Sequence, residues 1–223
     1  MTLLELPDLV QGSDEWLEQR RGMVTASVIG KLLTPTGRVA SNDYSRALTA
    51  QLVAERITGY VDAQHVTDDM LRGHEEEPRA RDLYSERYAP ARESGFLIRD
   101  EGTWRLGYSP DGLVGDDGLI EVKAPRAKKH LTTILSGEVP PEHMPQLQAG
   151  LFVSGREWID FLSFYGGMPM WRKRVYPDPQ WFEAIEAAVT AFEANAARMV
   201  AEYEAATQGL PPTERLIEQD MVI

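Results

Sequence analysis

Two carboxylates and a lysine are the residues of this chain whose types and spacing are best suited to chemistry. Asp111 follows a Ser-Pro pair, and Glu121 and Lys123 lie in the run Leu-Ile-Glu-Val-Lys after nine intervening residues. If residues 112–114 and 119–123 are adjacent strands of a hairpin that turns at 115–118, Asp111 and Glu121 meet at the same end of the sheet. Glu121 and Lys123 are two positions apart and share one face, while Val122 points into the core. The pattern therefore predicts two carboxylates and one ammonium group in one place.

That grouping is suited to a divalent cation and a phosphodiester. A pair of oxygen ligands with open coordination positions suits Mg²⁺, which keeps several waters and accepts substrate phosphate oxygens as further ligands. Such a site activates water and neutralises charge at a phosphodiester under attack. Lys123 would orient the water or stabilise the phosphate in the transition state. The alternative interpretation is a surface hairpin with an exposed Glu and Lys.

The elements that must position these residues are helices before and after a sheet. Ser13 is a fitting N-cap for a first helix that Gly22 closes, and Thr25 or Ser27 can cap a second helix through Leu33. Further helices are expected at 42–58, at 67–88 with an interruption near Gly73 and Pro78, at 142–153 and at 179–208. Short strand-like runs at 96–98, 104–108, 112–114 and 119–123 predict an antiparallel meander, and two more strands are expected at 158–164 and 171–176.

Composition predicts one globular domain over residues 1–223, with helices in 13–88, the sheet and metal site in 95–176 and a long helix at 179–208. The 223 residues are 43% apolar and include no cysteine, which excludes disulfide scaffolds and thiolate metal sites. No apolar stretch reaches the roughly eighteen residues that a membrane span needs, and the first residues lack the pattern of a signal peptide. We therefore expect a cytoplasmic protein with no membrane partner.

The net charge of −12, from 23 basic and 35 acidic residues, argues against a nucleic-acid partner at first sight. Nine acidic and two basic residues fall in 178–223, so −7 of the charge lies there and −5 in residues 1–177. Positive charge gathers in the segments 20–38, 123–130 and 172–174. These basic segments are either separate solvated loops or parts of one local positive cleft.

Four motifs in sequence order resemble those of one nuclease family. Pro110-Asp111 and Glu121-Val122-Lys123 match the PD-(D/E)xK pattern. Trp16, Arg20, Gly22 and Thr25-Ala26-Ser27 are similar to an amino-terminal W-x3-R-x-G-x2-TAS segment, Gly73 to Glu77 to a G-x3-E helix, and Gln146 with Gln148 to a Q-x-Q helix. Together they resemble the phage lambda exonuclease or YqaJ-like viral recombinase family of the PD-(D/E)xK nuclease superfamily, over about residues 11–165.

The resemblance implies an α+β fold, with a restriction-endonuclease-like α/β/α core in which helices flank a central mixed sheet. It also implies a catalytic set and a metal set. The catalytic residues would be Asp111, Glu121, Lys123, Glu77 and Gln146. The metal ligands would be Asp111, Glu121 and the main-chain carbonyl of Val122, with Glu77 as a further candidate. Gln148 is about 200° round the helix from Gln146 and cannot share its face. The cofactor would be Mg²⁺, with Mn²⁺ as a substitute.

A second group of residues would bind DNA. By resemblance, Arg20 holds a terminal 5′ phosphate, with Ser27 beside it and Ser109 on the backbone phosphate. An Arg fork, a Ser hydroxyl and the free N–H groups of a helix N-terminus form a phosphate pocket on physical grounds as well. Lys128, Lys129 and His130 are candidate DNA contacts.

The activity implied is Mg²⁺-dependent digestion of the 5′-ended strand of linear double-stranded DNA to mononucleotides, leaving 3′ overhangs for recombination by strand annealing. The resemblance implies that the protein acts on the ends of double-stranded DNA and assembles as a homotrimer. It also implies a single-strand annealing protein as partner and an origin in a phage, or in a prophage of a bacterial host. The segments 20–31 and 123–130 would line the trimer's channel, with the acidic tail outside. One alternative is a sister endonuclease without use for the Arg20 and Ser27 pocket, and the other is an inactive module that binds DNA ends or proteins.

Overall fold

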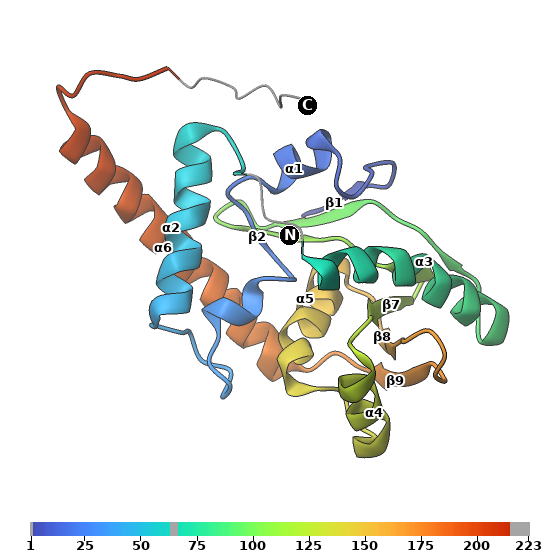
Figure 1. Cartoon of the computed structure of the whole chain (residues 1–223). Coiled ribbons are helices and arrows are strands. Elements are labelled where there is room, and N and C mark those ends of the chain that lie inside the picture. The colour runs from blue at the N-terminus through green and yellow to red at the C-terminus, as the bar shows by residue number, and fades with distance from the viewer. Residues whose placement is uncertain (1, 63–66, 215–223) are drawn as a thin grey trace, which may run out of the picture.

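The computed structural model describes residues 2–62 and 67–214, in which helices surround two mixed β-sheets (Figure 1). The first sheet has the spatial order β1 (Thr2–Leu6), β4 (Phe96–Asp100), β5 (Arg105–Tyr108) and β2 (Val24–Thr25). The second has the order β3 (Ala91–Arg92), β6 (Gly112–Val114), β7 (Gly118–Lys123), β8 (Trp158–Ser163) and β9 (Trp171–Val175). The predicted α+β class is confirmed, but the single central sheet is corrected to two.

The expected meander is divided between these sheets. β4 and β5 pair antiparallel in the first sheet, and β6 and β7 pair antiparallel in the second. The predicted β6–β7 hairpin is present, with Leu113 opposite Leu119 and Val114 opposite Gly118, so its turn is one residue shorter than expected; Gly115 turns the chain with φ +53°. β8 runs parallel to β7, so β7, which carries Glu121 and Lys123, is central in its sheet.

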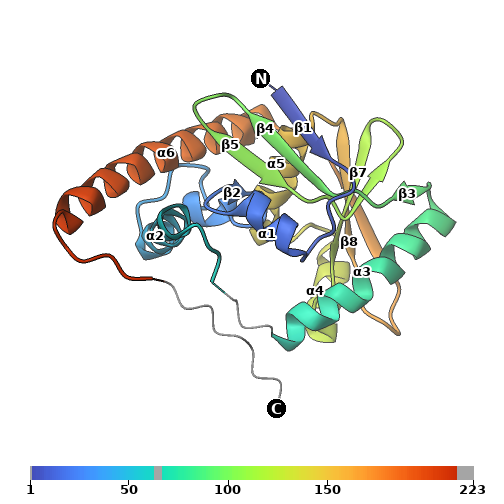
Figure 2. The same ribbon diagram turned by 90° about the horizontal axis from the view of Figure 1, so that it is seen from above.

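The two faces of the second sheet are covered by different helices (Figure 2). α5 (Met144–Ser154) packs its Leu147 and Leu151 with Leu119 of β7 in the larger core, which also holds side chains of α2 (Asp43–Thr58) and α6 (Pro179–Thr207). α3 (Asp68–Arg87) packs Ala80 and Tyr84 on the other face. The result is a helix, sheet, helix sandwich with Glu121 and Lys123 facing one side of it.

Capping explains where the helices begin and end. Ser13 caps α1 (Asp14–Arg20) by accepting a hydrogen bond from the N–H of Trp16 at 3.2 Å. Asn42 and Ser45 form a capping box at the start of α2, and Gly59 ends that helix with φ +69°. These boundaries match the expectations for 13–21 and 42–58.

Two helix predictions are wrong. The segment after Thr25 forms only the short 3₁₀ helix η1 (Ile29–Leu32), with no side-chain cap, because Thr25 pairs with Gly107 of β5 and Ala26 donates to the Gly107 carbonyl at 2.8 Å. Pro78 does not interrupt α3, which is continuous from 68 to 87. Pro78 lies on the exposed face of the helix. Water there can donate a hydrogen bond to the backbone carbonyl that the missing proline N–H leaves unpaired.

Five elements were not predicted from the sequence: strands β1, β2 and β3, the 3₁₀ helix η2 (Pro141–His143) and helix α4 (Ala127–Ser136). The helix α4 directly follows β7. Among the described residues no helix is long and apolar enough to cross a membrane. Residues 215–223 of the acidic tail lie outside the described part of the chain.

Candidate active site

A cleft of about 1220 Å³ opens between α1, the start of α3, the end of β7 and α4. Its walls include every site residue predicted from the sequence except His130. The carboxylates, the lysine and the predicted phosphate-binding residues therefore face one space, although they come from five separate parts of the chain.

Lys123 and Gln146 hold the carboxylate of Glu121 in place. Glu121 is only 1% exposed, and its Oε1 accepts hydrogen bonds from Lys123 Nζ at 2.7 Å and from Gln146 Nε2. Lys123 Nζ also donates to Gln146 Oε1 at 3.0 Å. The hydroxyl of Tyr108 lies 3.4 Å from Glu121 Oε2. This network connects the end of β7 to the first turn of α5.

Asp111 lies on the loop that enters β6 and is tied to the neighbouring strand. Its Oδ2 accepts a hydrogen bond from the Val122 main-chain N–H at 2.6 Å. The Val122 amide thus fixes Asp111 beside Glu121. Burial raises the pKa of Asp111 well above its ordinary value, and repulsion by Glu121 and Glu77 adds to the shift.

Glu77 comes from the middle of α3 and faces the same group. Arg81, one helical turn further on, donates from Nη1 to Glu77 Oε1 at 3.1 Å and to the Asp111 carbonyl at 2.7 Å. Burial raises the pKa of Glu77; Arg81 opposes the shift, and repulsion by Glu121 adds to it. Burial lowers the pKa of Lys123, but attraction by Glu121 and Asp111 outweighs it and the pKa is raised.

The donor set suits a hard divalent cation. Three carboxylates with two basic side chains, Lys123 and Arg81, leave a negative excess, and a cation beside Asp111 and Glu121 would relieve the repulsion that raises the pKa of Asp111. Within residues 2–62 and 67–214, no three acidic or histidine side chains already surround one point as metal ligands. The carboxylates are bonded instead to Lys123, Gln146 and the Val122 amide.

Arg20 lies on a second wall of the cleft, stacked on an aromatic ring. Its guanidinium carbon is 3.8 Å from the centre of the Trp16 ring, and its Nη2 donates to Thr25 Oγ1 at 3.4 Å. Thr25 Oγ1 is in turn 3.1 Å from the hydroxyl oxygen of Ser27. Trp16 Nε1 donates to Ser109 Oγ at 3.0 Å, which joins this wall to the loop that carries Asp111.

The expectation of a helix N-terminus beside Arg20 is corrected. Thr25 is part of strand β2, and η1 has four residues, so no helix dipole of useful length points into the cleft. The side chains of Arg20 and Ser27 are the donors that remain for an anion on this wall.

The three candidate DNA contacts on α4 divide into two kinds. Lys128 and Lys129 are exposed and line the cleft, and Lys129 pairs with Glu142 at 2.8 Å. His130 is fully buried, with Nδ1 2.7 Å from Ser163 Oγ and Nε2 3.0 Å from the Pro169 carbonyl. The prediction that His130 contacts DNA is therefore wrong, because both ring nitrogens are used inside the fold.

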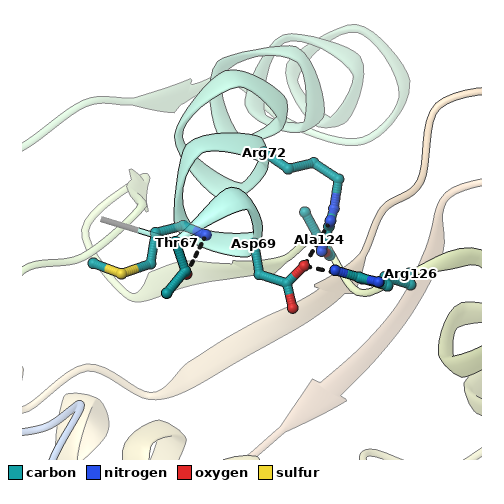
Figure 3. A network of polar contacts seen from close by, with 6 residues as sticks. Thr67, Asp69, Arg72, Ala124 and Arg126 are labelled. Atoms are coloured by element: carbon teal, nitrogen blue, oxygen red, sulfur yellow. Dashed lines mark hydrogen bonds and ion pairs between the residues drawn. The ribbon is translucent and has the colours of Figure 1, made fainter. Parts of the chain in front are cut away.

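A polar network ties the start of α3 to the loop after Lys123 (Figure 3). Arg72 donates from Nε and Nη2 to the Ala124 carbonyl at 3.2 and 3.0 Å. Asp69 Oδ1 accepts from Arg72 Nη1 at 2.9 Å and from Arg126 Nε at 3.1 Å. The helix that carries Glu77 and the strand end that carries Lys123 are thus fastened together at the mouth of the cleft.

Sequence reasoning missed Trp16 as a platform, Arg81 and Tyr108. The spacing of four between Glu77 and Arg81 is a helical signal that could have found Arg81. Gln148, which the sequence ranked below Gln146, is buried and bonds to the Tyr176 carbonyl and the Asp178 amide at 2.9 and 3.0 Å.

Comparisons with known proteins identify the family and the fold of this chain. The model of the YqaJ-like viral recombinase domain matches residues 15–157. The crystal structure of an alkaline exonuclease, LHK-Exo, from Laribacter hongkongensis is similar at 32% identity and a TM-score of 0.79, and the match covers 89% of this chain and 100% of that chain. LHK-Exo in complex with dAMP matches with the same values.

A phage related exonuclease from Haemophilus somnus 129PT shares the fold, with a TM-score of 0.62 at 12% identity, over 81% of this chain and 96% of that chain. No match was found among the curated protein sequences.

Proposed function

Since the chain belongs to the YqaJ-like viral recombinase family, we propose that it is a DNA exonuclease that digests the 5′-ended strand of linear double-stranded DNA. The products would be mononucleotides and a 3′ single-stranded overhang for strand annealing. The observation that carries the proposal is that Asp111, Glu121 and Lys123 face the same cleft as Arg20.

Mg²⁺ is the proposed cofactor, and Mn²⁺ would substitute for it. Asp111, Glu121 and the Val122 carbonyl would hold it, with Glu77 nearby. When bound, the ion would neutralise phosphate charge and make a water molecule more acidic. Hard oxygen ligands on a central strand support this assignment.

The side chains around the ion position a water molecule and a phosphate. Lys123 Nζ, held between Glu121 Oε1 and Gln146 Oε1, is protonated and presents its remaining N–H to a phosphate oxygen or to the attacking water. Gln146 bonds to both Glu121 and Lys123 and so fixes their orientation. Arg81 bonds to both Glu77 and the Asp111 carbonyl and so holds these two residues in fixed positions beside β7.

Arg20 and Ser27 would hold the terminal 5′ phosphate. The guanidinium is fixed on Trp16 with no carboxylate bonded to it in the described part of the chain, so its donors are available for an anion. Ser109, bonded to Trp16, would contact the backbone phosphate at the join between the two walls. Exposed Lys128 and Lys129 would contact phosphates further along the duplex.

Assembly and partners are also proposed from the family. A homotrimer that encloses duplex DNA would keep an acidic protein on its substrate, and a single-strand annealing protein would receive the exposed strand. Light scattering on the purified protein would give the mass of three chains if the trimer is correct.

The test uses end-labelled linear duplex, with and without a 5′ phosphate, in Mg²⁺. Wild-type protein is expected to release nucleotides from the 5′ ends, Asp111→Ala to release none, and Arg20→Ala to lose the preference for phosphorylated ends. A closed circular plasmid separates the alternatives: a sister endonuclease would cut it, the proposed exonuclease would leave it intact, and an inactive end-binding module would leave both DNAs intact.

A further inference from the structure

Two arginines at the mouth of the cleft share one carboxylate. Asp69 Oδ1 accepts hydrogen bonds from Arg72 Nη1 at 2.9 Å and from Arg126 Nε at 3.1 Å (Figure 3). All three residues line the cleft that holds Asp111 and Lys123. The hydrogen bonds from Arg72 and Arg126 lower the pKa of Asp69, so its carboxylate is charged at neutral pH. One negative charge therefore faces two positive charges at this point.

The connection between α3 and the loop after β7 does not depend on Asp69. Arg72 makes it through the two hydrogen bonds from Nε and Nη2 to the Ala124 carbonyl, at 3.2 and 3.0 Å. Asp69 and Arg126 are 58% and 73% exposed, and an ion pair between side chains so exposed adds little to stability because water screens it. Stability alone is therefore a weak reason for a carboxylate at this place.

Arg126 has hydrogen-bond donors that the protein does not use. A guanidinium carries five N–H groups, and within residues 2–62 and 67–214 the side chain of Arg126 bonds to a protein acceptor through Nε alone. Its Nη1 and Nη2 groups are thus open at the mouth of the cleft. A guanidinium with two open nitrogens can bind two oxygens of one phosphate in a planar, bidentate arrangement. Arg126 is therefore suited to an anion that approaches from the cleft.

We propose that Arg126 and Arg72 form a binding site for a phosphate of the DNA backbone, and that Asp69 is the counter-charge that this phosphate displaces from Arg126. The inference rests on the proposed function, since a DNA duplex is what brings phosphates to the cleft. Without DNA, Asp69 reduces the repulsion between the two arginines. When a phosphate approaches, the exposed Asp69–Arg126 pair costs little to break, and the phosphate binds the open donors of Arg126. Arg72 stays bonded to the Ala124 carbonyl and contributes its charge.

The charge of Asp69 opposes DNA binding in this arrangement. The carboxylate stays beside the bound phosphate and repels it, whereas an arginine side chain is charged with or without an acidic partner. Neutralising Asp69 should therefore strengthen DNA binding. If Asp69 served only to fasten α3 to the loop after Lys123, the same change would loosen that loop and weaken DNA binding. The two roles thus predict opposite signs for one substitution.

The experiment measures the Kd of a fluorescent, 5′-phosphorylated duplex oligonucleotide for the full chain by anisotropy. Ca²⁺ replaces Mg²⁺, since it also takes oxygen ligands, and a gel checks that the DNA stays intact. The titration is repeated over a range of KCl concentrations, because the slope of log Kd against log salt counts phosphate contacts. Asp69→Asn keeps the size of the side chain and removes its charge. Asp68→Asn is the matched control: Asp68 is exposed in the same first turn of α3 but does not line the cleft.

Asp69→Asn is expected to lower Kd about fivefold, the factor that Coulomb repulsion between two unit charges about 4 Å apart gives in water. Asp68→Asn should change Kd by less than about twofold, because that carboxylate lies outside the cleft and is screened. Arg126→Ala should raise Kd by about fivefold and reduce the salt slope by about one phosphate contact. Arg87→Ala, at the exposed far end of α3, should leave both quantities close to those of the wild type.

Two results overturn the inference while the proposed function stands. One is an Asp69→Asn variant that binds the duplex no more tightly than Asp68→Asn does. The other is an Arg126→Ala variant that keeps both the Kd and the salt slope of the wild type. Thermal unfolding checks that each variant is folded, and if Asp69→Asn does not fold, the salt slope of Arg126→Ala decides. A wild-type protein that releases no nucleotide from linear duplex in Mg²⁺ would instead refute the proposed function, and the inference with it.

Discussion

Arg81 is the basic residue that joins Glu77 to the Asp111 loop in the cluster of carboxylates formed by Glu77, Asp111 and Glu121. Its side chain is 11% exposed, and it donates to Glu77 and to the main chain of Asp111 at 3.1 and 2.7 Å. Arg81→Ala removes both hydrogen bonds and leaves Glu77 facing other carboxylates without its cation. Hydrogen bonds to charged groups contribute about 1.5–3 kcal/mol each, and the 23% exposure of Glu77 reduces the cost of leaving it unpaired. We therefore expect the free energy of unfolding to fall by about 3 kcal/mol.

The assay is urea unfolding followed by tryptophan fluorescence, in EDTA and in Mg²⁺. Mg²⁺ should recover part of the loss, because a cation in the site takes over the neutralisation of the carboxylates. The rate of nucleotide release should fall by about tenfold, since Glu77 and the Asp111 loop are no longer fixed relative to β7.

Arg87→Ala is the matched control on the same helix. Arg87 pairs with Glu86 at 3.8 Å and both side chains are exposed, at 67% and 68%, so the loss should be below about 1 kcal/mol and insensitive to Mg²⁺. Equal losses in the two variants, or no difference between EDTA and Mg²⁺ for Arg81→Ala, would refute the picture of three mutually repelling carboxylates restrained by Arg81.

Three further predictions concern pH, packing and charge. Burial lowers the pKa of His143 to about 4, with a further contribution from Lys123, so the unfolded chain binds the extra proton below pH 6.5 and stability falls as pH decreases. Between pH 7 and pH 5 this costs about 2 kcal/mol, which His143→Gln should remove from the pH dependence of urea unfolding. Gly150→Ala places a Cβ 2.7 Å from Tyr108 Cζ and should destabilise the protein by about 1–3 kcal/mol in the same assay. Charge reversal of Lys128 and Lys129 together should reduce processivity and lower the salt dependence of DNA binding by about two phosphate contacts.

Each of these has a control. For His143, wild-type and His143→Gln protein should have parallel stabilities between pH 7.5 and pH 9, where this imidazole is neutral in the folded and the unfolded chain. A Cβ at Gly73 meets nothing within 4 Å, so Gly73→Ala in the middle of α3 should stabilise by up to about 1 kcal/mol. Arg38 and Arg87 are exposed outside the cleft, and reversing their charges should leave processivity intact. Variants that behave like their controls would contradict the corresponding assignment.

The site was largely predictable because its chemistry is encoded locally. The spacing of Asp111, Glu121 and Lys123 defines a hairpin, and the register of β6 and β7 follows from alternation and from the glycine turn. The family predicted from the four motifs is confirmed by the match over residues 15–157. The individual catalytic and binding roles stay predictions.

The parts that failed depend on long-range pairing. Strand-like runs at 96–108 and 112–123 look continuous in the sequence, but β1 and β2 pair with the first run and β8 with the second, which separates them into two sheets. Thr25 resembled a helix cap because threonine is common both at helix N-termini and in strands. Its pairing with β5 places it in a strand. His130 lies in a basic cluster, yet its helix turns the ring inward to Ser163.

We propose that Asp111 and Glu121 hold a divalent cation next to Lys123, and anomalous scattering from a crystal soaked in Mn²⁺ tests this most directly. We expect a strong peak in contact with the carboxylates of residues 111 and 121 and the carbonyl of Val122, and its loss in Asp111→Asn. A peak elsewhere in the molecule, or none at this position while the crystal binds Mn²⁺ at other sites, would contradict it.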